Sequence, residues 1–358
     1  MSKISIQTTS KSRLSEVDFE NIPFGRIFAD HMFEMDYKKG EWVNANIRPY
    51  GNLSISPALS CMHYGQAIFE GMKAVRGENG ATLLFRPLEN WSRLNFSARR
   101  MSMPELPKSI FMDALENWLQ IDNDWIPEKA GSALYIRPLM IATDDYLGVK
   151  ASETYKFLIY GCPVASYYND PLRLRVEEHY VRAAVGGVGE AKAAGNYAAS
   201  MYPAGLGRKD GFHQLLWTDA TEHKYVEELG TSNFFAVVDG KLYTPETDGT
   251  ILQGITRDSV IQVAKHIGVE VIELKLSVDF LVDSHKTGTF TEAFATGTAA
   301  TIAPIELIQH RGYDMALSVS KDTLASKFEI ILNKIKLGKY EDFQSWSHMV
   351  DITQHQSN

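Results

Sequence analysis

The sequence predicts a mixed α/β fold divided into two domains. The chain has 358 residues, which exceeds the usual size of a single hydrophobic core. Segments whose apolar residues follow a helical spacing are interspersed with short apolar runs typical of strands. Hydrophobic residues make up 44% and charged residues 22% of the chain, as in ordinary globular proteins. The fold class is therefore α/β (mixed α+β).

The first half contains two predicted helices and two predicted buried strands. Pro87 is a favoured first helical residue, and the segment that follows it places Trp91, Leu94, Ala98 and Met101 on one face. The segment 109–120 does the same with Phe111, Ala114, Leu115 and Trp118. The continuous apolar runs 132–142 and 156–165 predict strands that are buried on both faces.

The second half repeats this mixture of strands and helices. The run 213–219 predicts a short strand, and 233–245 predicts a hairpin that turns at Asp239-Gly240. The segment 256–268 predicts a helix that ends at Gly268. We expect Val260, Val263, Ala264 and Ile267 to point inward. A strand follows in 269–274, and a last helix is expected over 323–338.

The domain boundary is expected at a turn signal near the middle of the chain. The tripeptide Asn169-Asp170-Pro171 is typical of a turn. We therefore expect a smaller N-terminal α/β domain at 1–168, a connection at 169–178, and a larger C-terminal domain at 179–358.

Composition excludes several classes of function. The net charge is −8, which argues against a nucleic-acid-binding or acidic-membrane-binding surface. No run of about 18 apolar residues is present, as a membrane span would require. The two cysteines, Cys61 and Cys162, have no metal-binding or redox spacing and fit a reducing compartment. We expect a cytoplasmic protein with no metal site, no nucleic-acid partner and no membrane partner.

The segment Gly186–Ser200 surrounds one lysine with very small residues. Around Lys192 nearly every neighbour is Gly, Ala, Ser or Asn, apart from Glu190 and Tyr197. Small neighbours permit a bulky group to approach the backbone closely. A flexible surface loop with a solvated lysine is the plain alternative.

Three further signatures suggest a phosphate-bearing cofactor. Two carboxylates, Glu227 and Glu228, precede Gly230-Thr231. The runs Gly254-Ile255-Thr256 and Gly297-Thr298-Ala299 are small-residue turns, and the first opens a helix whose N–H groups suit a phosphate. A lysine, a phosphate cradle and a buried carboxylate together suggest pyridoxal phosphate. Each signature also occurs in ordinary turns and on solvated faces.

These runs resemble those of a known enzyme family. In order and spacing, "KAAGNYAAS", "VEELGTSNFF", "ILQGITRDS" and "ATGTA" are similar to the branched-chain amino-acid aminotransferases. The first half agrees through "MHYGQAIFEGMKAVRG", "NWSRLNFSARRM" and "ALYIRP". The resemblance extends from about Pro23 to beyond Pro304 and implies a two-domain, fold-type-IV pyridoxal-phosphate enzyme. It also implies a homodimer.

The resemblance assigns a role to each matching residue. Lys192 matches the lysine that carries pyridoxal 5'-phosphate as a Schiff base, and Glu228, rather than Glu227, matches the partner of the ring nitrogen. Neighbouring strand residues point to opposite faces, so only one of the two glutamates can serve. The other residues implied to bind the cofactor are Arg93, Tyr197, Thr231, Ile255, Thr256 and Thr298.

The implied reaction moves the amino group of leucine, isoleucine or valine to 2-oxoglutarate and is reversible. The residues implied to bind substrate are Phe24, Tyr64, Phe69, Tyr135, Arg137, Tyr167, Thr298 and Ala299. Tyr135 and Arg137 are two residues apart on a predicted strand and so share a face. Arg137 is implied to meet the second carboxylate of 2-oxoglutarate. For the aromatic residues, ordinary core packing is the alternative.

Other activities remain open from sequence alone. D-amino-acid aminotransferases and aminodeoxychorismate lyases share the lysine and the glutamate, but they are generally shorter and lack "YGQAIFEGMKA" and "LYIRP". A catalytically silent, cofactor-storing protein is a further alternative. Ala300 and Ala303 occupy the places of a Cys-x-x-Cys pair found in animal members, so no thiol switch is expected there.

Overall fold

The computed structural model describes residues 4–165 and 170–352, and the chain divides into two compact units. Unit 1 comprises 1–167, 191–194 and 334–358, and unit 2 comprises 168–190 and 195–333. This division differs from the expected domains in two places. The short segment around Lys192 and the C-terminal segment both group with unit 1, because their contacts are made with its sheet and helices.

Unit 1 is a mainly antiparallel sheet covered by helices. In the described residues the sheet has nine strands, in the order β1-β3-β2-β8-β7-β5-β6-β18, with β4 added beside β7. The strands are β1 (Ser5–Ile6), β2 (His31–Lys38), β3 (Glu41–Pro49), β4 (Ala67–Phe69), β5 (Met72–Arg76), β6 (Thr82–Phe85), β7 (Ala133–Ala142), β8 (Tyr155–Val164) and β18 (Ser347–Val350). The helices are α1 (Ser60–Tyr64), α2 (Pro87–Arg100) and α3 (Lys108–Ile121), with 3-10 turns at Leu14–Glu16, Glu78–Gly80 and Asn123–Trp125.

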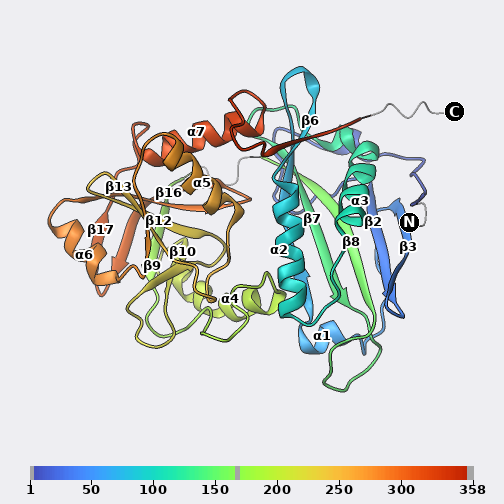
Figure 1. Cartoon of the computed structure of the whole chain (residues 1–358), viewed down its shortest axis with the longest axis horizontal. Helices are drawn as coiled ribbons and strands as arrows, with labels where there is room; N and C mark the ends of the chain where they lie inside the picture. Colours follow the sequence, from blue (N-terminus) through green and yellow to red (C-terminus); the bar gives the residue numbers. More distant parts are fainter. Residues whose placement is uncertain (1–3, 166–169, 353–358) are drawn as a thin grey trace. The chain divides into compact units, whose positions relative to one another are not determined.

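Helices α2 and α3 pack on this sheet through the faces predicted from sequence (Figure 1). Phe111, Ala114, Leu115 and Trp118 of α3 are all fully buried. Burying one such large side chain contributes about 1.5–3 kcal/mol to folding. The expected strands 132–142 and 156–165 are confirmed as β7 and β8, which pair along their whole length.

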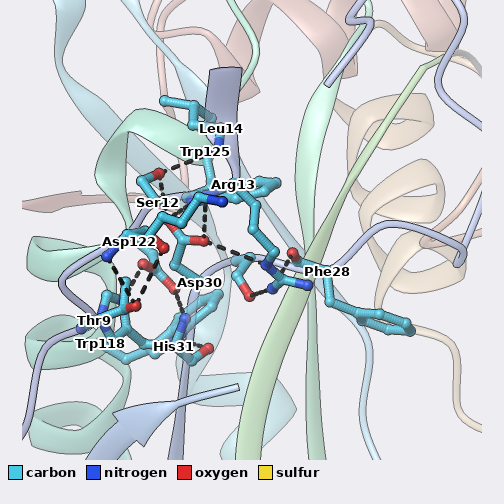
Figure 2. A network of polar contacts seen from close by, with 12 residues as sticks. Thr9, Ser12, Arg13, Leu14, Phe28, Asp30, His31, Trp118, Asp122 and Trp125 are labelled. Atoms are coloured by element: carbon cyan, nitrogen blue, oxygen red, sulfur yellow. Dashed lines mark hydrogen bonds and ion pairs between the residues drawn. The ribbon is translucent and has the colours of Figure 1, made fainter. Parts of the chain in front are cut away.

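A buried polar network fastens the N-terminal segment to unit 1 (Figure 2). The backbone N–H of Thr9 donates to Nε2 of His31 at 2.9 Å, so that ring nitrogen carries no proton. The proton is therefore on Nδ1, which bonds the Asp122 carboxylate at 2.6 Å. Next to this pair, the carboxylate of Asp30 accepts bonds from Ser12, the backbone of Arg13 and the Trp125 indole. Residues 9–13 are thus held by the Asp30 carboxylate and by His31, which Asp122 in turn fixes.

Unit 2 is a second sheet that closes on itself. Its order in the described residues is β11-β10-β9-β16-β15-β12-β13-β14, with β17 beside β16, and β11 also pairs with β12. The strands are β9 (Leu172–Val176), β10 (Gln214–Thr218), β11 (Val226–Leu229), β12 (Asn233–Val238), β13 (Lys241–Pro245), β14 (Val271–Leu274), β15 (Phe290–Gly297), β16 (Thr301–His310) and β17 (Tyr313–Ala316). The helices are α4 (Ala194–Lys209), α5 (Ile255–His266), α6 (Val278–Lys286) and α7 (Leu324–Lys336).

The turn chemistry of unit 2 follows the sequence closely. The predicted hairpin is confirmed, since β12 and β13 pair with Val238 opposite Lys241. Asp239 and Gly240 have φ values of 49° and 72°, the left-handed pair that a two-residue hairpin turn requires. Among the described residues, no helix is both long and apolar enough to cross a membrane.

Two expectations about unit 2 were wrong. The stretch 169–178, expected as a connection, contains β9, which pairs in parallel with both β10 and β16. Leu172, Leu174 and Val176 alternate with two arginines and are buried, a strand pattern that the preceding turn signal obscured. Ile267 was expected inside, but it is the residue after α5 and is 37% exposed.

Candidate active site

The backbone of Lys192 is fixed by two elements of unit 1. Its N–H donates to Oγ of Ser97 on α2 at 2.9 Å, and its carbonyl accepts from the N–H of Phe69 on β4 at 3.1 Å. The next residue, Ala193, forms an isolated bridge with Ile68. The Lys192 amine lies 4.9 Å from the centre of the Phe69 ring. The lysine therefore extends the sheet edge at β4 and is not part of a flexible surface loop.

A cluster of aromatic and cationic side chains lies beside this lysine. The guanidinium carbon of Arg137 is 4.6 Å from the centre of the Phe69 ring. Nη2 of Arg137 donates to the hydroxyl of Tyr135 at 3.1 Å, so these two residues share a strand face as expected. The Phe24 ring meets Tyr135 edge-on, with ring centroids 5.5 Å apart. Four of the residues assigned to the substrate are thus brought together in unit 1.

The remaining substrate residues of unit 1 are less closely tied to this cluster. Tyr64 ends α1, is largely exposed, and donates its hydroxyl to the Leu147 carbonyl. Tyr167 lies outside the described residues. Gly71 is needed next to Tyr135, since a Cβ there would collide with the tyrosine hydroxyl.

Arg93 is held by a carboxylate that the sequence analysis missed. Nε and Nη2 of Arg93 each lie 2.8 Å from an oxygen of Glu70, which is 0% exposed. Asn90 donates to the same carboxylate at 2.8 Å. Burial acts to raise the pKa of Glu70, but the charges of Arg93 and Lys192 outweigh it and hold the pKa below its usual value. Glu70 is therefore an anion that Arg93 bonds directly and that the charge of Lys192 also stabilises.

A second lysine of unit 1, Lys73, is half-buried. Lys73 is on β5, opposite Tyr135 of β7 in the strand register. Burial lowers the pKa of Lys73 to about 8. A lysine with a lowered pKa is more often neutral at physiological pH, as a nucleophilic amine must be.

Glu228 in unit 2 is held as an anion by an arginine. Nη2 of Arg182 lies 2.5 Å from Oε1 of Glu228, and both side chains are buried. The same nitrogen donates to the carbonyls of Gly189 and Thr250, at 2.8 and 2.7 Å. The Leu252 N–H donates to Oε1 of Glu228 at 2.9 Å. Such donors favour the charged form of a buried carboxylate.

Asn233 connects this carboxylate to the turn before α5. Its amide nitrogen bonds Oε2 of Glu228 at 3.2 Å and the Leu252 carbonyl at 2.9 Å. Gly254 is required beside it, since a Cβ at this position would collide with the Asn233 side chain. The acid and the start of α5 are therefore one connected structure.

The other residues assigned to the cofactor lie on unit 2 as follows. Ile255 and Thr256 form the first turn of α5, after Gly254 at the helix N-cap. Thr298 and Ala299 form the turn between β15 and β16. Thr231 is in the turn between β11 and β12, where its hydroxyl accepts a bond from Gln214 at 3.3 Å. Tyr197 is in the first turn of α4.

Glu227 is buried on the other face of β11. It is 5% exposed, and its Oε2 atom has no hydrogen-bond partner. Burial raises the pKa of Glu227 to about 7, against the smaller opposing effects of the Thr250 hydroxyl and Arg182. The two adjacent glutamates therefore have different surroundings: Arg182 bonds Glu228, whereas one carboxyl oxygen of Glu227 has no donor.

Three residues with clear roles were missed in the sequence. Glu70 and Asn233 are within the quoted runs "FEGMKA" and "GTSNFF", and a polar residue inside an apolar strand run was the available signal. Arg182 is isolated among Val181, Ala183 and Ala184 and gave no such signal. Only the fold brings it to Glu228.

The comparisons with known proteins agree on one family. A family model described as "Amino-transferase class IV" matches residues 67–308. The chain is a class IV aminotransferase. A branched-chain-amino-acid aminotransferase 2 of Bacillus subtilis (strain 168) is 43% identical over 352 residues, covering 96% of each chain. A branched-chain-amino-acid transaminase 1 of the same organism is 44% identical over 336 residues, covering 92% of this chain and 94% of the relative.

Solved class IV aminotransferases share the fold. A branched-chain aminotransferase of the archaeon Thermoproteus uzoniensis, crystallised with norvaline, matches with a TM-score of 0.75 and 25% identity. It covers 90% of this chain and 100% of its own. A branched-chain amino acid aminotransferase of T.th., complexed with N-(5'-phosphopyridoxyl)-L-glutamate, matches with a TM-score of 0.74 and 25% identity over 91% of this chain and 100% of its own. The expected fold-type-IV architecture is confirmed.

Proposed function

We propose that this class IV aminotransferase moves the amino group of leucine, isoleucine or valine to 2-oxoglutarate. The products are the branched-chain 2-oxo acid and L-glutamate, and the reaction is reversible. The observation that carries the proposal is the joint presence of two sets of residues: Lys192 with Phe69, Tyr135 and Arg137 in unit 1, and Glu228 with Arg182 in unit 2. Relatives with 43% and 44% identity carry branched-chain names, which supports the same substrate class.

The chemistry of these residues fits pyridoxal 5'-phosphate. An aldehyde needs a primary amine, which Lys192 supplies. A protonated pyridine nitrogen needs an anion, which Glu228 supplies because Arg182 keeps it charged. A phosphate needs N–H donors, which the first turn of α5 offers in unit 2, and positive charge, which Arg93 offers in unit 1. Tyr197, Thr231, Thr256 and Thr298 add hydroxyl groups to this donor set.

When bound, pyridoxal phosphate draws electrons from the α-carbon of the amino acid and so makes its proton acidic. In our proposal Lys192, as a free amine, would take this proton as a general base. Glu228 keeps a proton on the ring nitrogen throughout. Because the charge of Arg182 opposes protonation of Glu228, this carboxylate would leave the proton on the ring nitrogen.

Two kinds of side chain must be accepted by one pocket. Leucine, isoleucine and valine are aliphatic, and we propose that Phe69, Tyr135 and Phe24 line their site. Glutamate and 2-oxoglutarate carry an added carboxylate, for which Arg137 is the matching cation. Arg137 lies over the Phe69 ring and bonds Tyr135, so the charged group adjoins the apolar wall. Thr298 and Ala299 are proposed to bind the α-carboxylate common to both substrates.

A panel of amino donors with 2-oxoglutarate as acceptor tests this proposal. We expect leucine, isoleucine and valine to give rates at least a hundredfold above D-alanine and L-aspartate. A preference for D-alanine would instead support a D-amino-acid aminotransferase. Pyruvate release from aminodeoxychorismate without transamination would support a lyase. No spectral change with any amino acid would mean a silent protein. Light scattering tests the proposed homodimer, which should have about twice the mass of one chain.

A further inference from the structure

Unit 2 contains a cavity that the proposed reaction does not use. Its volume is about 450 Å³, within the range of small-molecule sites. Glu227 lines it, whereas Glu228, its neighbour on β11, does not. Two residues that interact with the Glu227 carboxyl, Thr250 and Asp248, line the cavity as well. The Glu227 side chain therefore faces this cavity, on the side of β11 opposite to Glu228.

One oxygen of the Glu227 carboxyl is buried without a hydrogen-bond donor. Its Oε2 atom is buried and has no hydrogen-bond partner, although the residue is only 5% exposed. Leaving such a group unsatisfied costs about 1–3 kcal/mol, and more if it is charged. A ligand that donates to this oxygen would recover that cost. Arg182, the cation whose charge acts on Glu227, forms its ion pair with Glu228.

The lining shows which ligand charge is favoured. Five carboxylates line the cavity, those of Asp219, Glu222, Glu227, Glu246 and Asp248, against one cation, Lys275. The Asp219 carboxylate accepts four backbone N–H groups, from Thr221, Glu222, Lys224 and Tyr225, which fix the cavity's edge. An anion would be repelled here. Within the described part of the chain, no group of three or more His, Cys, Asp or Glu residues is arranged to hold a metal ion.

Most of the rest of the lining is apolar, apart from Thr221, Tyr225 and Thr250. Val226, Pro245 and Ile251 are buried residues of the cavity wall. Val185 and Leu274 also line the cavity and keep exposed surface, which a ligand with a short aliphatic chain would remove from water, at about 25 cal/mol for each Å² buried. The cavity thus combines one unsatisfied carboxylate with an aliphatic wall. We propose that it binds a small organic cation that donates an N–H bond to Glu227 and packs a short aliphatic chain against Val185 and Leu274.

Calorimetric titration of the holoenzyme with n-butylguanidinium tests this site. This probe carries N–H donors and a four-carbon chain, and it is not a primary amine that could attack the cofactor aldehyde. We expect one site per chain, with no change in the cofactor's absorbance. Glu227→Gln should weaken binding at least tenfold, since a hydrogen bond to a charged group contributes about 1.5–3 kcal/mol. The matched control Glu222→Gln removes an exposed lining carboxylate and should change the affinity less than threefold.

Two further measurements need only the unaltered protein. Because Glu227 ionises near pH 7, affinity for the permanently charged probe should rise about tenfold from pH 6 to pH 8. 1-Pentanol, which is neutral but has an aliphatic chain of similar length to that of n-butylguanidinium, should not bind. Equal binding by the alcohol, no pH dependence, or equal losses in the two variants would overturn the proposal. Binding of Mg²⁺ or K⁺ that competes with the probe would show an inorganic cation site and would also overturn it.

Discussion

Glu70 and Arg93 form a two-point ion pair in which Nε and Nη2 of the arginine each lie 2.8 Å from a carboxylate oxygen. Arg93 is the residue that the family resemblance assigns to the cofactor phosphate. Its orientation is set by a carboxylate that is itself fully buried. The arginine is thus held in place by protein contacts and does not depend on a phosphate for its position.

Loss of the Glu70 charge should therefore be costly. Breaking a buried ion pair by removing one partner costs about 3–5 kcal/mol. We predict that Glu70→Gln lowers the free energy of unfolding of the apoprotein by roughly 3 kcal/mol in urea denaturation. The control is Glu89→Gln, since Glu89 is 46% exposed and lies 3.6 Å from Arg86. That variant should lose less than about 0.5 kcal/mol. Equal losses in both would mean that the Glu70 pair is not a major contact.

The two adjacent glutamates should differ sharply in catalysis. Glu228 is bonded by Arg182, Leu252 and Asn233, whereas Glu227 faces the opposite side of β11. We predict that Glu228→Gln lowers kcat at least a hundredfold, because an amide cannot keep the ring nitrogen protonated, and that Glu227→Gln lowers it less than tenfold. Steady-state kinetics with leucine and 2-oxoglutarate measures both. A larger loss at Glu227 would reverse the assignment.

Arg137 should matter mainly to substrates with a second carboxylate. A hydrogen bond to a charged group contributes about 1.5–3 kcal/mol, or roughly tenfold to hundredfold in a rate constant. We predict that Arg137→Met slows the half-reaction with glutamate by this factor and the half-reaction with leucine by less than threefold. Single-turnover absorbance of the cofactor measures each half-reaction. Arg99→Met, a surface control paired with Glu105, should change neither. Parallel losses with both substrates would make Arg137 a structural or α-carboxylate-binding residue.

The raised pKa of Glu227 predicts a pH dependence of stability. In the folded protein its pKa is about 7, whereas the usual value is 4.5. Between these values the folded state binds more protons than the unfolded state, so stability falls as pH rises. We predict that, between pH 5 and pH 8, the free energy of unfolding of the unaltered protein falls by about 2–3 kcal/mol relative to that of Glu227→Gln. Urea denaturation at several pH values measures this difference. The corresponding difference between the unaltered protein and Glu222→Gln, in which an exposed glutamate is changed, should not vary with pH.

Much of the fold could be predicted because local signals and packing agreed. The helices at Pro87–Arg100 and Lys108–Ile121 have one apolar face, and the Asp239-Gly240 turn has the residues its backbone requires. The strand Leu172–Val176 was missed because two arginines interrupt its apolar residues and a turn signal precedes it. Ile267 was misplaced because a spacing rule does not show where a helix ends.

Only some residues of the candidate site could be predicted from the sequence. Lys192, Glu228 and Arg137 were found through motif spacing and the family resemblance. Glu70, Arg182 and Asn233 were not, since their roles arise from contacts with partners 23, 46 and 5 residues away. Which carboxylate orients an arginine, and which arginine keeps a carboxylate charged, depends on tertiary packing that no local pattern encodes.

We propose that Lys192 carries the cofactor and that a branched-chain amino acid displaces it. Lys73 is the rival amine, since burial lowers its pKa to about 8. Borohydride reduction followed by peptide mass spectrometry locates the lysine to which the cofactor becomes permanently attached, before and after excess leucine without a keto acid. We predict attachment at Lys192 before leucine and little attachment at any lysine after it. Attachment at Lys73, or attachment at Lys192 that leucine does not diminish, would contradict the account.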